Sequence, residues 1–237
     1  MEATITCAIS RRNFLIRGGA LAAGAALLGP AQLLAAEKPE TAAADVTPTE
    51  DLMREHGVLR RLMLIYGEIE ERLAGGKEFP LPALAGATDL LRRFIQDYHE
   101  KDEEDFLFPR FEKAGKLTDL VKVLYAQHQA GRKITAQLQG LATAATLQQP
   151  AERQKLIKNL EAFIRMYRPH AAWEDTVLYP AFRSVITPRE FVTLGDKFED
   201  KEQELFGQDG FEKIVGQVAG LEKQLGLYDL SQFTPKG

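Results

Sequence analysis

Cysteine is almost missing from this chain of 237 residues, and its absence removes several kinds of site. The one cysteine is Cys7, ahead of every segment that has the pattern of a folded element. Disulfide bonds, thiolate-bound zinc and thiol catalysis are therefore not expected. An excess of basic charge is missing as well, because 30 basic residues face 34 acidic ones and leave a net charge of −4. Nucleic acid is accordingly not an expected partner.

The first 36 residues differ in kind from the rest. The segment SRRNFLIRGGALAAGAALLGPAQLLAA places Arg11 and Arg12 before an apolar stretch diluted by glycine. This pattern resembles a twin-arginine export signal, and the glycines suit a cleaved signal better than a membrane span. We expect residues 1–36 to be removed, residues 37–46 to form a linker, and the mature protein to be periplasmic or otherwise exported, without a stable membrane span. An uncleaved amino-terminal anchor is the alternative.

The export prediction can be tested on the two arginines. Changing Arg11 and Arg12 to lysine should leave the precursor in the cytoplasm, because the twin-arginine machinery reads this pair. Cell fractionation followed by immunoblotting of precursor and mature forms measures the effect. Unchanged export of the double variant would point to another route.

Strand-like alternation bounded by turn residues is also missing, and helical spacing takes its place. TPTE at 47–50 has the spacing of a capping box, with Pro48 at the first helical position. Four helices are predicted, over 48–74, 83–106, 118–145 and 150–179. Pro109 and Pro180 should stop the second and the fourth. The expected fold is all-α, an up-down-up-down four-helix bundle over 47–186.

A helical extension follows the predicted bundle. TPRE at 187–190 is a second capping box and should open a helix that reaches about Phe206. A further amphipathic helix is predicted over 211–225, ending at Gly226. Residues 187–237 carry no ligand pattern, so the expected role of this extension is packing on the bundle or against another subunit.

Histidine is scarce, with four in the chain, and one falls on each predicted helix: His56, His99, His128 and His170. The segments HEKDEEDFLFPRF (99–111) and HAAWEDTVLYPAF (170–182) both read H-x3-E-[E/D]-x2-L-[F/Y]-P-x-F. HGVLRR and HQAGRK, at the other two histidines, both read H-x3-R-[R/K]. The chain is therefore a helical hairpin written twice, with an expected pseudo-twofold axis.

The repeated motif predicts a metal site. Glu103 and Glu174 follow their histidines by four residues and so share a helix face with them. Imidazoles from four helices and one carboxylate from each of two helices can enclose two metal ions, bridged by the glutamates. Each ion would take two histidines, either from one hairpin or from a facing pair. Histidine suits Fe, Zn, Cu and Ni, and bridging carboxylates suit redox-active iron or manganese. Glu104 and Asp175 are either outer partners or alternative ligands.

The same residues also have plainer interpretations. HEKDEED alone can be a solvated acidic helix end, and a lone histidine is more often structural than a ligand. The L-[F/Y]-P-x-F tail should close the end of the bundle, Arg60 and Arg132 should pair with acids or solvent, and Trp173 and the phenylalanines should be core. The two copies differ by two residues in the stretch before the histidine of their H-x3-E motif. This difference predicts a kink or π-bulge between Phe94 and His99, or in the corresponding stretch of the other copy.

On these motifs the chain resembles the hemerythrin-like, or HHE cation-binding, domain over about residues 48–185. The resemblance implies a four-helix bundle that holds a non-haem centre of two Fe ions, with Mn or Zn as alternatives. It implies a small diatomic or peroxide ligand: the site handles oxygen, peroxide or nitric oxide, or senses iron or oxygen. The ligand residues carried over are His56, His99, Glu103, His128, His170 and Glu174.

Two departures from the oxygen-carrying members affect the expected chemistry. Arg132 stands where those members have a second histidine on the third helix. Their last carboxylate is at the position of Asp175, whereas symmetry with Glu103 favours Glu174. Arg132 cannot ligate a metal as a cation, but it could donate hydrogen bonds to a peroxide or oxyanion. This favours peroxide or other oxidoreductase chemistry, with a sensor, an oxygen-binding module or an iron store as the alternatives.

Overall fold

The structure is a computed structural model that describes residues 46–235. The predicted export signal at 1–36 and the linker up to residue 45 lie outside the described residues. The described part contains helices and no strands, as predicted. None of its helices combines the length and apolar character that a membrane span requires.

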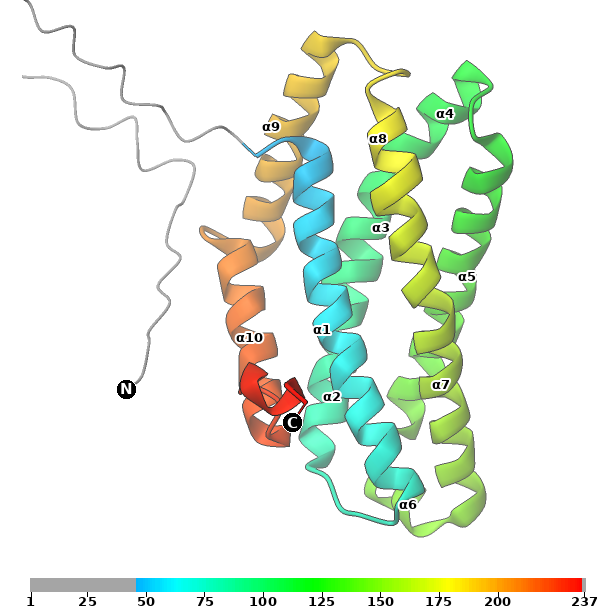
Figure 1. Ribbon diagram of the computed structural model, residues 1–237, viewed down its shortest axis with the longest axis vertical. Coiled ribbons are helices and arrows are strands. Elements are labelled where there is room, and N and C mark those ends of the chain that lie inside the picture. The colour runs from blue at the N-terminus through cyan, green and yellow to red at the C-terminus, as the bar shows by residue number, and fades with distance from the viewer. Residues whose placement is uncertain (1–45, 236–237) are drawn as a thin grey trace, which may run out of the picture. The chain divides into compact units, whose positions relative to one another are not determined.

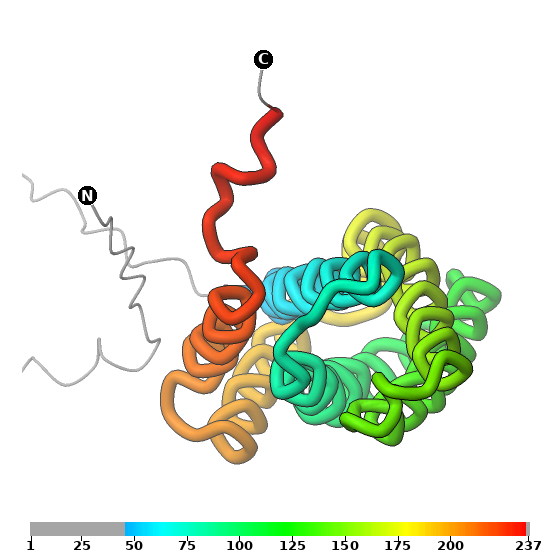
Figure 2. Tube along the Cα trace, turned by 90° about the horizontal axis from the view of Figure 1, so that it is seen from below, coloured from blue at the N-terminus to red at the C-terminus, as the bar shows by residue number. Residues whose placement is uncertain are grey.

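Four long helical segments run up, down, up and down around a shared core, with their ends visible in cross-section (Figures 1 and 2). The first segment is α1 (Pro48–Ala74). The second comprises α2 (Leu81–Leu90), η1 (Leu91–His99), α3 (Glu100–Asp102), η2 (Glu103–Leu107) and α4 (Phe108–Ala114). The third and fourth, joined by α6 (Ala144–Gln148), are α5 (Thr118–Leu141) and the run α7 (Pro150–Trp173), η3 (Glu174–Leu178) and α8 (Tyr179–Phe182). The predicted all-α bundle is confirmed.

Both predicted capping boxes are present. At the start of α1 the Glu50 Oε2 atom accepts from the Thr47 backbone N–H at 2.9 Å, and the Thr47 side chain accepts from the Glu50 N–H at 3.4 Å. The same reciprocal pair, Thr187 and Glu190, opens α9 (Pro188–Phe206). Each box satisfies two donors that a helix start leaves unpaired.

Pro109 and Pro180 do not stop their helices, so that prediction was wrong. Each proline lies just after a π-helical turn, η2 or η3, and the helix continues to Ala114 or to Phe182. At these turns the backbone N–H of Phe108 bonds to Glu103 O and that of Tyr179 to Glu174 O, five residues back. The wider turn moves the preceding carbonyls away from the proline ring, which would clash with them in a regular α-helix.

The kink or π-bulge that was predicted before the histidine of the H-x3-E motif occurs in the first copy of the repeat. There η1 is π-helical over Leu91–His99. In the second copy α7 continues as an α-helix through Pro169 to Trp173. Despite this difference in backbone, His99 and His170 are both buried, with 2% and 3% of their surface exposed.

Apolar side chains form two clusters, one toward each end of the bundle. The larger contains Leu62, Tyr66, Phe94 and Phe163, and the smaller contains residues such as Phe111. On each long segment the histidine falls between residues of one cluster and residues of the other. The histidines therefore form a polar layer sealed from solvent on both sides by apolar packing.

Trp173 is not core, contrary to prediction, and 54% of its surface is exposed. The adjacent Glu174 is fully buried and points inward. Because successive residues on a helix are rotated by about 100°, the side chain at position 173 is turned away from the centre of the bundle.

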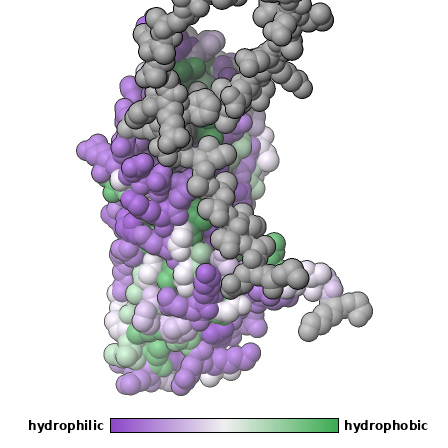
Figure 3. Space-filling view, turned by 90° about the vertical axis from the view of Figure 1, so that its left-hand side faces the viewer, coloured by the Kyte–Doolittle hydropathy of each residue, from purple (hydrophilic) through white to green (hydrophobic). Residues whose placement is uncertain are grey.

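The C-terminal extension packs on the bundle, as predicted. In α10 (Gly210–Leu225) Ile214 and Val218 are buried in the larger cluster, and Glu222 binds Arg61 of α1 through two hydrogen bonds of 2.8 and 2.5 Å. The side of the molecule that carries α9 and α10 is mostly hydrophilic where the described residues are visible (Figure 3). A short 3-10 turn, η4 (Leu230–Phe233), follows.

Candidate metal centre

The four histidines lie in one buried layer and form two pairs. The rings of His56 and His99 are 4.7 Å apart between centroids, and those of His128 and His170 are 4.9 Å apart. No more than 3% of any of them is exposed. Each pair comes from one hairpin of the repeat. The sequence left two pairings open, within a hairpin or between facing helices, and the structure shows the pairing within a hairpin.

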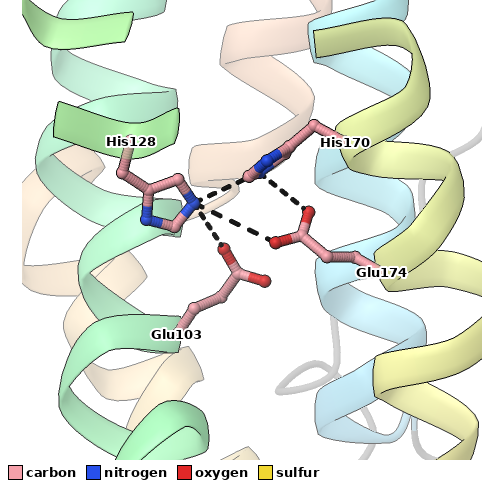
Figure 4. A group of neighbouring side chains, drawn as sticks. All are labelled: Glu103, His128, His170 and Glu174. Carbon is pink, nitrogen blue, oxygen red and sulfur yellow. Dashed lines mark hydrogen bonds and ion pairs between the residues drawn. The ribbon is translucent and has the colours of Figure 1, made fainter. Parts of the chain in front are cut away.

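The two motif glutamates lie between the histidine pairs. Glu174 Oε2 is 3.2 Å from His56 Nε2 and 3.1 Å from His170 Nε2, so one oxygen faces a histidine of each pair. Glu103 Oε2 is 3.4 Å from His128 Nε2 and 3.7 Å from His99 Nε2. Figure 4 shows Glu103 and Glu174 pointing toward His128 and His170.

The donor set fits metal ions on three counts. Ligand atoms of Glu103, His128, His170 and Glu174 all lie within 4.8 Å of one another. Three of the four glutamate oxygens, Glu103 Oε2 and both of Glu174, are buried without a hydrogen-bond partner among the described residues. Two nitrogens held by one ion at about 2.1 Å are separated by roughly 3 Å. The 3.2 Å between His128 Nε2 and His170 Nε2 meets this requirement.

The outer nitrogen of every histidine is held by an oxygen. His56 Nδ1 lies 2.7 Å from Asp175 Oδ1, and His128 Nδ1 lies 3.2 Å from Glu104 Oε1. The acids that follow the motif glutamates are thus placed outside the histidines, where they bond across from one hairpin to the other. A carboxylate at Nδ1 fixes the proton there and leaves Nε2 with a free lone pair directed at the centre.

Two further outer partners were missed from the sequence. Glu55 Oε2 lies 2.7 Å from His99 Nδ1, and Gln127 Oε1 lies 2.9 Å from His170 Nδ1. These residues immediately precede the histidines of the first and third helices, so they occupy the same place in the repeat. An alignment of the two copies that began one residue before these histidines would have revealed both partners. Their chemistry differs, since one is an acid and the other a neutral amide.

Arg60 and Arg132 pair with acids, as predicted. Arg60 bonds Asp175, and Arg132 bonds Glu104 Oε1 at 2.7 Å and Glu100 Oε2 at 2.8 Å. Each arginine therefore holds the carboxylate that holds a histidine. This explains the four-residue spacing in H-x3-R. The guanidinium of Arg132 lies on the outer side of His128, and its predicted role as a hydrogen-bond donor to peroxide stays a prediction.

Helices α5 and α7 approach closely beside this network. A Cβ atom on Gly131 would lie 2.0 Å from the Tyr167 hydroxyl oxygen, so a side chain at this position is excluded unless the ring moves. The Tyr167 hydroxyl donates to Glu100 Oε1 at 2.5 Å. Glycine at position 131 thus lets Tyr167 reach the acid that also binds Arg132.

The tail of the motif, which was predicted to be purely structural, contacts a histidine in both copies and supplies a polar group in one of them. Phe108 stacks on His128 and Tyr179 stacks on His56, both with ring centroids 5.5 Å apart. The Tyr179 hydroxyl donates to Glu103 Oε1 at 2.8 Å and lies 3.4 Å from His56 Nε2. Phenylalanine supplies no such group in the other copy, so the two halves of the site differ chemically.

Protons balance the charges of this cluster when no cation is bound. Burial lowers the pKa of His56, but the carboxylates of Asp175 and Glu174, which face its two ring nitrogens, outweigh burial and raise the pKa to about 9. Burial and the neighbouring Glu174 raise the pKa of Glu103 to about 7. Burial opposes ionisation of Glu174 too, but His170 and His56 hold its pKa well below the usual range. A metal cation would displace these protons, since the ligands bind in their deprotonated forms.

Comparison with known proteins agrees with this geometry. The family described as the hemerythrin HHE cation-binding domain matches residues 47–182. Two similar relatives are the uncharacterized proteins Mb2018 of Mycobacterium bovis and Rv1995 of Mycobacterium tuberculosis. Each is 45% identical over 242 residues, covering 99% of this chain and 94% of the relative. No solved structure matches significantly. The matched family covers more than half of the chain and all six candidate ligands, and the chain therefore belongs to the hemerythrin HHE cation-binding domain family.

Proposed function

We propose that the chain holds two iron ions between its histidine pairs and reacts with peroxide. One observation carries the proposal: four histidine Nε2 atoms and two buried carboxylates converge, while an outer oxygen fixes each histidine Nδ1. His56 and His99 would hold one ion, His128 and His170 the other, and Glu103 and Glu174 would contact both. Such a pair of ions supplies redox chemistry and positions for small oxygen-containing ligands.

The donor set favours iron, or manganese, over zinc. Structural zinc sites are closed by four ligands, usually with thiolates. Here each ion would receive two imidazoles and one oxygen from each glutamate, which would make four donors and leave positions open on an ion that accepts six. Carboxylates shared between two ions on a four-helix bundle are typical of di-iron and di-manganese proteins.

The residues around the centre favour reaction over reversible oxygen binding. The Tyr179 O–H lies against Glu103 and carries a proton that can move at that oxygen. Apolar clusters on both sides exclude bulk water, which strengthens the effect of every charge in the layer. Arg132 supplies no ligand in place of the extra histidine of oxygen carriers, so neither ion gains additional protection.

Stopped-flow mixing with hydrogen peroxide tests this function. Iron-loaded protein should convert hydrogen peroxide to water and dioxygen over many turnovers, a disproportionation in which one peroxide molecule reduces another and no further reductant is needed. Tyr179→Phe should reduce the rate constant roughly 10²- to 10⁴-fold because a positioned proton donor is lost. Tyr125→Phe, the same change at an exposed tyrosine of α5, is the matched control and should retain the wild-type rate. Iron content must be equal in all three proteins.

Variants of Arg132 and Arg60 distinguish an arginine that contacts peroxide from one that only holds an outer carboxylate. Loss of turnover in Arg132→Ala but not in Arg60→Ala would support a contact with peroxide, because both arginines hold outer carboxylates in the same way. An oxygen adduct that forms on mixing with dioxygen and dissociates under vacuum, without turnover of peroxide, would refute the enzyme. A slow spectral change coupled to protease sensitivity beyond residue 187 would instead favour the sensor.

A further inference from the structure

A surface pocket lies beside the candidate metal centre, between α5 and α7. Its volume is about 280 Å³, and Leu120, Val123, Pro169 and Trp173 contribute apolar walls. Val123 and Trp173 are 53% and 54% exposed, which places them at the mouth. His170, of which 3% is exposed, and Gln127 line the pocket on its buried side. The pocket thus leads from solvent to the outer edge of a candidate iron ligand.

His170 is distinguished from the other three histidines by its outer partner. The Nδ1 atoms of His56, His99 and His128 each face a carboxylate. His170 Nδ1 faces the neutral amide oxygen of Gln127 at 2.9 Å. That bond occupies Oε1 of Gln127, and the amide Nε2 can donate to an oxygen atom of an occupant.

The size and lining of the pocket indicate the class of occupant. A water molecule takes roughly 30 Å³ in the liquid, so the pocket is far larger than peroxide or a diatomic gas requires. It is slightly below the range of about 300–1,000 Å³ for sites of drug-sized ligands. Apolar walls with an indole ring and a proline ring suit a flat aromatic ring. A single amide beside them suits one polar substituent.

We propose that this pocket binds a small phenol, with the aromatic ring against Trp173 and the phenolic oxygen at Gln127. The coupling of this pocket to iron rests on the proposed function, whereas the binding of the phenol does not. An occupant that engages the Gln127 amide changes the hydrogen bond to His170 Nδ1. Because such outer bonds tune the basicity of a ligating imidazole, the occupant should alter the spectrum of the iron centre.

Intrinsic fluorescence provides a direct test, because Trp173 is the only tryptophan of the chain. Titration of purified mature protein with 4-methylphenol should produce a saturable change in emission, both with iron and after chelation. Cyclohexanol, a non-aromatic probe of similar size, should bind at least tenfold more weakly. Absence of a saturable change with 4-methylphenol would overturn the proposal.

Matched variants locate the binding. Val123→Phe should fill the mouth and weaken 4-methylphenol binding at least tenfold. Val192→Phe, the same change at an exposed valine of α9 (66% exposed), should leave it unchanged. Gln127→Leu should weaken binding of 4-methylphenol but not of toluene, which has the same ring and methyl group and no hydroxyl. Equal affinities in Val123→Phe and wild type would refute the site.

The iron spectrum distinguishes failure of this inference from failure of the proposed function. In iron-loaded protein, saturating 4-methylphenol should shift the absorption bands of the centre, and the Gln127→Leu variant should abolish the shift. Binding seen by fluorescence without any spectral shift would refute coupling through His170. Phenol binding to a protein that takes up no iron would support the pocket and refute the di-iron function.

Discussion

Replacing His56 and His99 together by alanine should leave one metal ion per chain instead of two. These histidines form one pair, and each lies on the opposite side of the two glutamates from His128 and His170. In the proposed two-ion centre, the double variant would remove both nitrogens from one ion and none from the other. His128→Ala with His170→Ala should also leave one ion.

The crossed double variant His56→Ala with His128→Ala is the informative comparison. It removes one nitrogen from each ion, so both positions should lose affinity together and the metal content should fall well below one per chain. Elemental analysis of purified mature proteins, with circular dichroism to verify folding, measures the outcome. Equal metal contents in the paired and crossed variants would contradict the pairing by hairpins. Val192→Ala, on the exposed face of α9, controls for losses during preparation.

Metal removal should lower the melting temperature of the wild type by roughly 10 °C. A ligand held at a thousand times its Kd adds about 4 kcal/mol to stability. In a domain of this size each kcal/mol corresponds to about 2–4 °C. Calorimetry of iron-loaded and chelated protein measures the difference. If the chelated protein melts at the same temperature as the iron-loaded protein, the site formed by the histidines and glutamates holds no ion.

Glu103→Gln should have opposite effects on stability and on metal binding. Two buried carboxylates face each other in the metal-free protein, and burial and Glu174 raise the pKa of Glu103 to about 7. A glutamine removes this charge and can still accept from the Tyr179 hydroxyl through its amide oxygen. We expect the metal-free variant to be about 1–3 kcal/mol more stable than the metal-free wild type, because ionising a buried carboxyl group beside the Glu174 carboxylate is costly.

The pH dependence of this gain has a defined sign. A carboxyl group with a raised folded-state pKa contributes most stability below its unfolded pKa of about 4.5, and this contribution is lost as the pH rises through about 7. The advantage of Glu103→Gln should therefore grow between pH 5 and pH 8 in chelated samples. The variant should gain little or no stability from iron. Glu71→Gln, at an exposed position on α1, is the matched control and should change neither property.

The sequence repeat was enough to predict which histidines and glutamates face the centre of the bundle, because the same spacing of these residues occurs in both copies. A four-residue spacing fixes a helix face, and the recurrence of H-x3-E on two helices and of H-x3-R on the other two requires a common centre. The same alignment contained Glu55 and Gln127 one residue earlier, and these positions were overlooked. The position shared by Phe108 and Tyr179 is different. An aromatic ring there closes the bundle in either copy, and only the packed structure shows that one hydroxyl reaches Glu103.

The course of the backbone near Pro109 and Pro180 could not be read from local sequence. Proline excludes a regular α-helical turn, and a stop is the usual outcome. A π-helical turn is an alternative that tertiary packing must stabilise, since its own geometry is poor. Here the turns η2 and η3 begin at Glu103 and Glu174 themselves, so the site and the irregular backbone are formed together.

The outer bonds of the histidines have a consequence for the origin of the chain. Glu55 and Gln127 bond within their own hairpins, whereas Glu104 and Asp175 bond across to the other hairpin. One hairpin with this pattern is self-complementary: two identical copies, arranged as a homodimer, would satisfy every histidine and enclose both ions. Joining the copies in one gene removes the need for identical halves. Glutamine opposite glutamate and tyrosine opposite phenylalanine are differences that a homodimer of identical hairpins cannot have.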